Sequence, residues 1–182
     1  MNKLQNEFFQ MAVPAALESQ RATGVPASIT LAQAILESGW GQTGLAKKAF
    51  NFFGIKTAHH VAPDSYIELP THEVINGHTV VQMADFARYA SAQDSFKAHA
   101  LLLAQASRYA PAMAVRTSPA KFAAAIQKCG YSTNPNYAQG LMRLVTEFDL
   151  TQYDQLPSDM DPSLGTTRNA PPASPAAKEQ AA

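Results

Sequence analysis

Apolar residues recur at helical spacing along most of the first 150 residues of the chain. The spacing predicts a mainly helical fold with helices over residues 6–23, 28–38, 91–110, 118–130 and 135–150. Pro14 predicts an interruption of the first helix, because proline lacks the N–H that an interior helical position needs. Ser28 and Ser118 stand where N-cap residues are expected, and Pro119 occupies the favoured first helical position.

The same repeat predicts which helix faces are buried. Positions three and four residues apart lie on one side of a helix and should face the core. These positions are Ile29, Ala32, Ile35 and Leu36 in the second helix, Phe96, His99, Leu102, Leu103 and Tyr109 in the third, and Tyr137, Leu141, Leu144, Val145 and Phe148 in the last.

Between residues 65 and 84 the pattern changes to β-branched residues around an Asn-Gly pair at 76–77. Asn-Gly is the strongest short signal for a two-residue hairpin turn. The register that follows pairs Ile75 with His78, Val74 with Thr79 and Glu73 with Val80. The sequence therefore predicts a mainly α domain (class α+β) with a small β-hairpin lobe.

From residue 157 the composition changes to Pro, Ala and Ser, with few large apolar side chains. Such a segment buries too little to offset its conformational entropy, so we expect it to be disordered. We place the boundary between a folded domain over 1–155 and a flexible tail over 156–182.

Composition excludes several classes of function. The charge is balanced, 14 Lys and Arg against 14 Asp and Glu, so we expect no nucleic-acid partner. No apolar stretch reaches the roughly 18 to 20 residues of a membrane-spanning helix, and the first residues lack the apolar core of a secretory signal. The histidines and the single cysteine, Cys129, show no metal-ligand spacing, so we expect no metal and no cofactor. Cys129 lies on an apolar helix side and should be buried by packing.

Glu37 ends the second predicted helix and is followed by glycines, the single tryptophan Trp40 and the Phe-Asn-Phe-Phe run at 50–53. A carboxylate in the last turn of a helix faces the negative end of the helix dipole, which favours its protonated form. Desolvation by Trp40 and the phenylalanines would act in the same direction. A carboxyl group still protonated near neutral pH is what a general acid requires. Position alone also fits a solvated surface glutamate.

Two further features bear on this chemistry. Glu73, on the first hairpin strand, is a candidate for the second carboxylate that glycoside hydrolysis commonly needs, with Glu68 and Asp64 as competitors. The loop 129–140 holds Tyr131 and Tyr137, whose rings can stack on a sugar face. Packing between helices is the other reading of both tyrosines, and it is the stronger one for Tyr137.

Three segments resemble the glucosaminidase family of peptidoglycan hydrolases, glycoside hydrolase family 73. Residues 31–56, with Glu-Ser-Gly-Trp-Gly at 37–41 and Asn-Phe-Phe-Gly-Ile-Lys at 51–56, resemble the family's signature. Residues 71–91 are similar to its hairpin, and residues 130–141 to its Gly-Tyr…Asn-Pro-x-Tyr-Ala motif. The three segments occur in the family's order.

The resemblance implies a lysozyme-like fold with a groove between helical lobes and a small β-lobe. It implies that Glu37 is the catalytic acid, Glu73 the second carboxylate and Tyr131 the residue that positions substrate or water. We expect substrate binding by Trp40, Asn51, Phe53 and Tyr137. No metal site is implied.

The resemblance implies a hydrolase of β-1,4 bonds in peptidoglycan glycan strands, an endo-β-N-acetylglucosaminidase. A muramidase or lytic transglycosylase acting on the neighbouring bond is an alternative, and so is a non-catalytic glycan-binding module of a secretion or phage-tail apparatus. The expected partner is peptidoglycan, the expected state a monomer without membrane insertion. Action on the cell wall without a visible secretory signal fits a phage lysin, a virion-associated enzyme or export by a dedicated apparatus.

Overall fold

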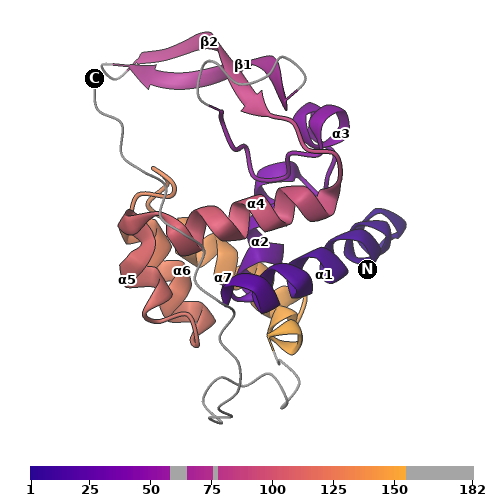
Figure 1. The fold of residues 1–182 in the computed structure, drawn as a ribbon, viewed down its shortest axis with the longest axis vertical. Coiled ribbons are helices and arrows are strands. Elements are labelled where there is room, and N and C mark those ends of the chain that lie inside the picture. The colour runs from indigo at the N-terminus through magenta and orange to yellow at the C-terminus, as the bar shows by residue number, and fades with distance from the viewer. Residues whose placement is uncertain (58–64, 76–77, 155–182) are drawn as a thin grey trace, which may run out of the picture.

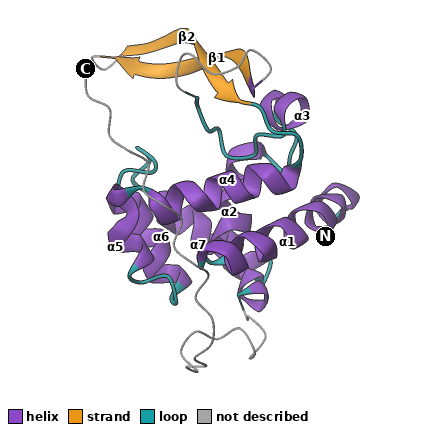
Figure 2. Ribbon diagram, in the orientation of Figure 1, coloured by secondary structure: helices purple, strands orange, loops and turns teal. Residues whose placement is uncertain are grey.

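A computed structural model of the chain describes residues 1–57, 65–75 and 78–154. Helices surround a buried centre, and a two-stranded hairpin lies beyond them at one end of the molecule with α3 beside it (Figure 1). Figure 2 separates the helical body from the strands. The elements are α1 (Lys3–Thr23), α2 (Ala27–Ser38), α3 (Gly44–Ala49), β1 (Tyr66–Ile75), β2 (His78–Ala87), α4 (Ala92–Gln105), η2 (Ser107–Tyr109), α5 (Ala110–Met113), α6 (Pro119–Lys128), α7 (Tyr137–Glu147) and η3 (Leu150–Tyr153).

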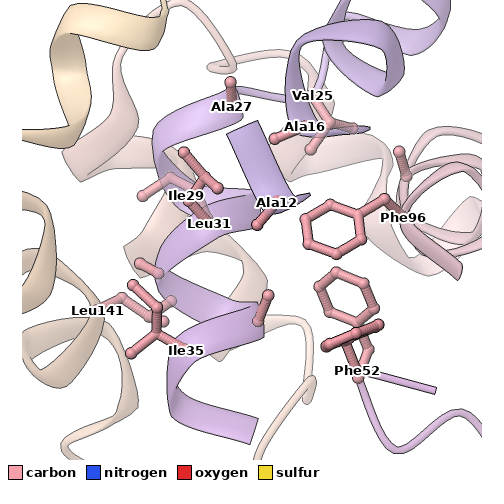
Figure 3. Close-up of a cluster of buried hydrophobic side chains, with 14 of the residues drawn as sticks. Ala12, Ala16, Val25, Ala27, Ile29, Leu31, Ile35, Phe52, Phe96 and Leu141 are labelled. Carbon is pink, nitrogen blue, oxygen red and sulfur yellow. The ribbon is translucent and has the colours of Figure 1, made fainter. Parts of the chain in front are cut away.

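Helix α2 is the centre of the core. It contacts α1, α6, α7 and η3, and ten of its twelve residues are buried. Figure 3 shows Leu141 of α7 on one side of α2 and the rings of Phe52 and Phe96 on the other. A helix that is apolar around most of its circumference needs such an enclosure, because water would otherwise contact its surface.

Helix α1 runs without a break through Pro14, so the predicted interruption is wrong. Proline in a helix interior costs about 3 kcal/mol, because a hydrogen bond is lost and the ring meets the preceding turn. Pro14 and Gln10, whose carbonyl loses that bond, both lie on the exposed side. The opposite side of α1 is buried on both sides of the proline: Phe8, Phe9, Ala12, Ala15, Ala16, Ser19 and Gln20. This burial holds the two halves in one helix.

The N-terminus of α2 is capped by residues distant in sequence. Helix α2 begins at Ala27, and Ser28 lies inside it rather than at the predicted N-cap. The backbone N–H of Ser28 donates to Oδ1 of Asp154 at 2.8 Å, and the N–H of Ala27 donates to Oε1 of Gln20. The side-chain amide of Gln20 also donates to the carbonyl of Asp154 at 3.1 Å. These bonds join α1, α2 and the segment after η3.

The hairpin has the register that the Asn-Gly pair predicts, with Glu73 opposite Val80 and Ile75 opposite His78. The turn residues 76–77 lie outside the described part of the chain. The open end of the hairpin is held by backbone hydrogen bonds from Ala87 N–H to Ile55 (2.9 Å) and from Thr57 N–H to Asp85 (2.9 Å). The hairpin therefore joins the helical body through the segment that follows α3.

The structure also bears on several smaller predictions about helix ends and burial. Helix α6 begins as predicted, with the Ser118 hydroxyl accepting from the N–H of Lys121 and Pro119 in the first turn. The helix predicted over 91–110 ends at Gln105, and Tyr109 is buried from the 3-10 turn η2. Leu36 and Leu102 are exposed rather than buried. Cys129 is half-buried against the core. The predicted tail 156–182 lies outside the described residues.

Candidate active site

Glu37 lies where α2 leaves the core. Of the twelve residues of α2, only Leu36 and Glu37 are exposed, and both belong to its last turn. The buried length of α2 fixes the position of this turn. Glu37 is therefore accessible to solvent and is held on a rigid helix. A catalytic carboxyl group needs both.

A tight turn ends α2 directly after Glu37. Gly39, Trp40 and Gly41 follow one another with positive φ angles of 54°, 61° and 73°. A Cβ on Gly41 would lie 3.3 Å from the Phe52 ring, so glycine fits both the backbone angle and the space. The hydroxyl of Ser38 accepts from the N–H of Gly41 at 2.8 Å and closes the turn. The Glu-Ser-Gly-Trp-Gly sequence thus encodes an abrupt helix end beside the carboxyl group.

Tyr137 is the hydrogen-bond partner of Glu37. Its hydroxyl, at the start of α7, donates to Oε1 of Glu37 at 2.9 Å. The same hydroxyl accepts from Nε2 of Gln33 at 3.0 Å. Gln33 lies one helical turn before Glu37 in α2 and is fully buried. The three side chains form a chain of hydrogen bonds from the core to the exposed carboxyl group.

Burial raises the pKa of the Glu37 carboxyl group above its usual 4.5, and the hydrogen bond from Tyr137 lowers the pKa by a smaller amount. The side chain is open to solvent over part of its surface, while the surrounding protein still removes enough water to disfavour the charge. The direction is the one that the sequence predicts for a general acid.

Tyr131 lies against this group. Its ring stacks on that of Tyr137 with centroids 5.5 Å apart and an interplanar angle of 25°. Burial raises the pKa of the Tyr131 phenol strongly, and the negative charge of Glu37 adds to the rise. Tyr131 also packs against the His99 ring in an edge arrangement, with the ring centroids 5.9 Å apart. The structure thus brings Glu37, Tyr131 and Tyr137 together from three separate segments of the sequence.

The other predicted substrate-binding residues are placed differently. Asn51 is 1% exposed, and its amide group donates to the carbonyls of Ile55 (2.8 Å) and Ala87 (2.9 Å). Phe53 is 5% exposed and stacks on His99 at 3.9 Å. Tyr137, at 3% exposed, is buried as well. These three side chains expose almost no surface to a sugar in this structure, and their predicted role in substrate binding stays a prediction.

Trp40 packs within a cluster of phenylalanines. Its half-buried ring makes edge contacts with Phe8, Phe9 and Phe148 at 5.0 to 5.6 Å between centroids. Phe52 likewise packs on Phe8 and Phe96. These contacts place Trp40 and Phe52 in one aromatic cluster with Phe8, and the predicted desolvation of Glu37 by these rings stays a prediction. Tyr137 of α7 donates to Glu37, and the ring of Tyr131 stacks on that of Tyr137.

The hairpin register separates the carboxylate candidates on β1. Alternate residues of a strand belong to opposite faces, and directly paired residues share one. Position 73 belongs to the set that includes Ile67, which is paired with the buried Phe86. Glu68 is exposed and belongs to the other set, which includes Met83 (54% exposed). Glu73 thus belongs to the alternating set of strand positions that includes the buried Phe86 at the open end of the hairpin. Asp64 lies outside the described residues.

Two residues near the site were missed by the sequence reasoning. Gln33 precedes Glu37 by four residues, so the helical repeat places both on one face and could have revealed it. His99 was assigned only to a buried face. It is fully buried beneath Tyr131, and this burial lowers the pKa of its imidazole to about 3. His99 is therefore neutral at physiological pH.

Within the described residues, no group of three or more His, Cys, Asp or Glu side chains could hold a metal ion. Among the helices of the same part of the chain, none has the length and apolar character to cross a membrane.

Comparison with known proteins gives the family. Residues 13–150 match the family model Glucosaminidase, described as mannosyl-glycoprotein endo-beta-N-acetylglucosaminidase. The chain is 37% identical over 145 residues to the exo-glucosaminidase LytG of Bacillus subtilis, covering 75% of this chain and 48% of LytG. It is 36% identical over 143 residues to the peptidoglycan hydrolase FlgJ of Salmonella typhimurium, covering 76% and 44%. The chain thus spans about half the length of these relatives, or less.

Solved structures agree. The catalytic domain of the autolysin Auto from Listeria monocytogenes matches with a TM-score of 0.74 at 27% identity, covering 85% of this chain and 89% of that one. A C-terminally truncated glycoside hydrolase domain of Salmonella typhimurium FlgJ matches with a TM-score of 0.64 at 31% identity, covering 80% and 97%. A sequence match over most of the folded part, together with these folds, shows that the chain belongs to the glucosaminidase family, glycoside hydrolase family 73.

Proposed function

We propose that the protein is a peptidoglycan hydrolase that cleaves β-1,4 glycosidic bonds of the glycan strand as an endo-β-N-acetylglucosaminidase, with Glu37 as the general acid. The observation that carries the proposal is the Glu37 carboxyl group itself. It is exposed at the end of a buried helix, its pKa is raised by burial, and a tyrosine hydroxyl holds it at 2.9 Å. Membership of the glucosaminidase family supports the choice of substrate.

In the proposed reaction, the proton of Glu37 passes to the glycosidic oxygen as the bond from that oxygen to the sugar C1 breaks. The positive charge that develops at C1 is stabilised by a second carboxylate, for which we propose Glu73. Water then adds its oxygen to C1 and loses a proton to a carboxylate. A proton donor positioned in this way accelerates a reaction by about 100- to 10,000-fold.

Tyr131 is proposed to position the substrate or the attacking water. Its ring is half-buried beside Tyr137, which leaves part of it accessible, and burial, with the Glu37 charge adding to it, raises the pKa of its phenol. A phenol that keeps its proton can donate a hydrogen bond to a sugar or accept one from water. Trp40, also half-buried, is proposed as a further sugar contact.

A second candidate is cleavage of the neighbouring bond, the N-acetylmuramidase reaction. It is favoured by one relative, a probable N-acetylmuramidase of Lactococcus lactis, which is 31% identical over 139 residues. Both reactions need the same acid, so the arrangement around Glu37 fits either.

The experiment that tests the proposal is digestion of purified peptidoglycan, followed by reduction of the new ends with borohydride and identification of the reduced sugar by mass spectrometry. Reduced N-acetylglucosamine at the new ends supports the glucosaminidase. Reduced N-acetylmuramic acid identifies the muramidase, and anhydro ends identify a lytic transglycosylase. If no new glycan ends form while an active control enzyme produces them from the same peptidoglycan, the proposal is overturned.

The proposal places the protein at the bacterial cell wall, acting as a monomer without membrane insertion and without a cofactor. The names of the relatives, an autolysin of Enterococcus faecalis and the peptidoglycan hydrolase FlgJ, support the substrate. Size-exclusion chromatography with light scattering tests the monomer. Sedimentation with purified sacculi tests the binding of peptidoglycan.

A further inference from the structure

Gln33 lies fully buried in α2, among apolar residues, one turn before Glu37. Its side-chain nitrogen donates to the hydroxyl of Tyr137 at 3.0 Å, and that hydroxyl donates to Oε1 of Glu37 at 2.9 Å. The inference drawn from this arrangement rests on the proposed role of Glu37 as the acid.

The direction of the two hydrogen bonds follows from the donors available. A phenol carries one proton, and an amide nitrogen can only donate. Because Gln33 donates to the Tyr137 oxygen, the Tyr137 hydroxyl can donate its proton to Oε1 of Glu37, which accepts at 2.9 Å. Oε1 of Glu37 is the accepting oxygen in this arrangement.

We propose that Gln33, acting through Tyr137, decides which oxygen of Glu37 carries the acid proton. An oxygen that already accepts a hydrogen bond at 2.9 Å has no room for a proton of its own along that line. The proton consequently sits on Oε2. Gln33 and Tyr137 are positioning residues in this proposal, since neither has to touch the substrate.

The opposite orientation of the amide shows what the arrangement prevents. If Gln33 presented its carbonyl oxygen to Tyr137, the phenol would donate to Gln33 instead. Glu37 would then have to donate from Oε1 to Tyr137, and its proton would be directed into the protein. A proton held there could not reach a glycosidic oxygen.

The state of the Gln33 carbonyl oxygen argues against a role in packing alone. Oε1 of Gln33 is buried without a hydrogen-bond partner among the described residues. A buried polar atom without a partner destabilises the fold, and an apolar side chain of similar length would avoid this cost. The useful part of Gln33 is therefore its N–H group, which holds Tyr137.

The decisive variant is Gln33→Met, which keeps the length of the side chain and removes the donor. We expect kcat to fall about five- to tenfold with KM unchanged. We also expect the alkaline limb of the pH–rate profile to move to higher pH, because a loosened Tyr137 stabilises the ionised form of Glu37 less well. Tyr137→Phe should move the limb in the same direction and lower kcat further. Titration of Glu37 by carbon NMR of its carboxyl group follows the same shift without substrate.

The matched control is Thr30→Val, in the same buried helix. Its hydroxyl donates to the carbonyl of Pro26 at 3.1 Å and belongs to the helix backbone network. This variant should lower the melting temperature slightly and leave the pH profile in place. A Gln33→Met enzyme that behaves like Thr30→Val would overturn the assignment. If Gln33→Met does not fold, Tyr137→Phe provides the test. The assignment is overturned if this variant keeps both the alkaline limb of the pH–rate profile and the NMR titration of Glu37 at their wild-type positions.

Failure of the proposed function is recognised separately. If Glu37→Gln keeps full activity, Glu37 is not the acid and the proposed function fails. If Glu37→Gln is inactive while Gln33→Met keeps wild-type kcat and pH profile, only the role of Gln33 is overturned.

Discussion

The hydroxyl of Tyr137 lies 2.9 Å from a carboxylate oxygen of Glu37, although 100 positions of sequence separate the two residues. Glu37 ends the most buried helix of the domain, and Tyr137 begins the last one. Packing of α7 on α2 therefore assembles the candidate acid, and variants of the carboxyl group test it most directly.

Replacement of Glu37 by Gln keeps the shape of the side chain and its ability to accept from Tyr137, but removes the acid proton. Clearing of purified sacculi should fall at least about 100-fold, the lower end for general acid catalysis. The circular dichroism spectrum should be unchanged. Activity within a few-fold of wild type in a folded variant would remove Glu37 from the mechanism.

The same variant should be more stable than wild type at neutral pH. Burial raises the pKa of Glu37 in the folded protein, so the folded state binds its proton more tightly than the unfolded chain does. Stability from this group is present at low pH and is lost as the pH rises through the folded pKa. Glu37→Gln carries no charge and avoids the loss. Thermal unfolding at pH 4 and pH 7 should show a gain for the variant at pH 7 that is absent at pH 4.

His99 predicts a pH dependence of the opposite sign. Its folded pKa is about 3, against 6.5 in the unfolded chain, so stability is present above pH 6.5 and is lost as the pH falls toward 3. The slope is about 1.4 kcal/mol per pH unit for one such group. In His99→Leu the unfolding free energy should be flatter between pH 6.5 and 4 by about this amount. Parallel curves for variant and wild type would show that His99 titrates normally.

Removal of the Asp154 side chain should destabilise the domain through α2. Its carboxylate caps the N-terminus of α2 by accepting from the N–H of Ser28 at 2.8 Å. Loss of an N-cap acceptor costs about 0.5 to 2 kcal/mol. Asp154→Ala should lose this amount in urea unfolding, while Glu18→Ala, on the exposed side of α1, should lose little. A chain ending at residue 155 keeps the cap and should melt like the full chain, whereas one ending at residue 149 should not.

These residues also show how much of the fold could be predicted from the sequence. The hairpin register and the start of α6 follow from local signals, an Asn-Gly turn and a Ser-Pro cap, and both are confirmed. The cap of α2 could not be predicted, because Asp154 is 126 positions away from Ser28 and only the folded chain brings them together. Pro14 was misread because its cost is local while the burial that outweighs it is not.

The site divides in the same way. The helix end beside Glu37 was predicted from its glycines, and the predicted rise of the Glu37 pKa by burial is borne out in direction. The contact with Tyr137 could not be predicted, because 100 positions of sequence separate it from Glu37 and only the folded chain brings the two together. Trp40 packs on Phe8 and Phe148.

The proposed role of Glu73 as the second carboxylate calls for a test of its own. It lies opposite Val80 near the turn of the hairpin, while the open end is tied to residues 55–57 by backbone hydrogen bonds. The distance from Ala87 to Val80 along β2 is about 23 Å at ~3.3 Å per residue. A hairpin of two strands fixed at one end is an element that can move toward a bound glycan.

We therefore expect Glu73→Gln to lower kcat at least about tenfold, but less than Glu37→Gln, because charge stabilisation and water activation can be shared with the acetamido group of the substrate.

The matched control is Glu68→Gln on the same strand. Glu68 is exposed and belongs to the other alternating set of β1, so its variant should stay within about twofold of wild type. The Glu68→Gln variant should melt like wild type, since an exposed strand position contributes little to stability. If both variants keep wild-type kcat on sacculi, the second carboxylate is not Glu73, and water activation passes to Tyr131 or to the substrate. Loss in Glu68→Gln alone would show that the face of the hairpin has been assigned wrongly.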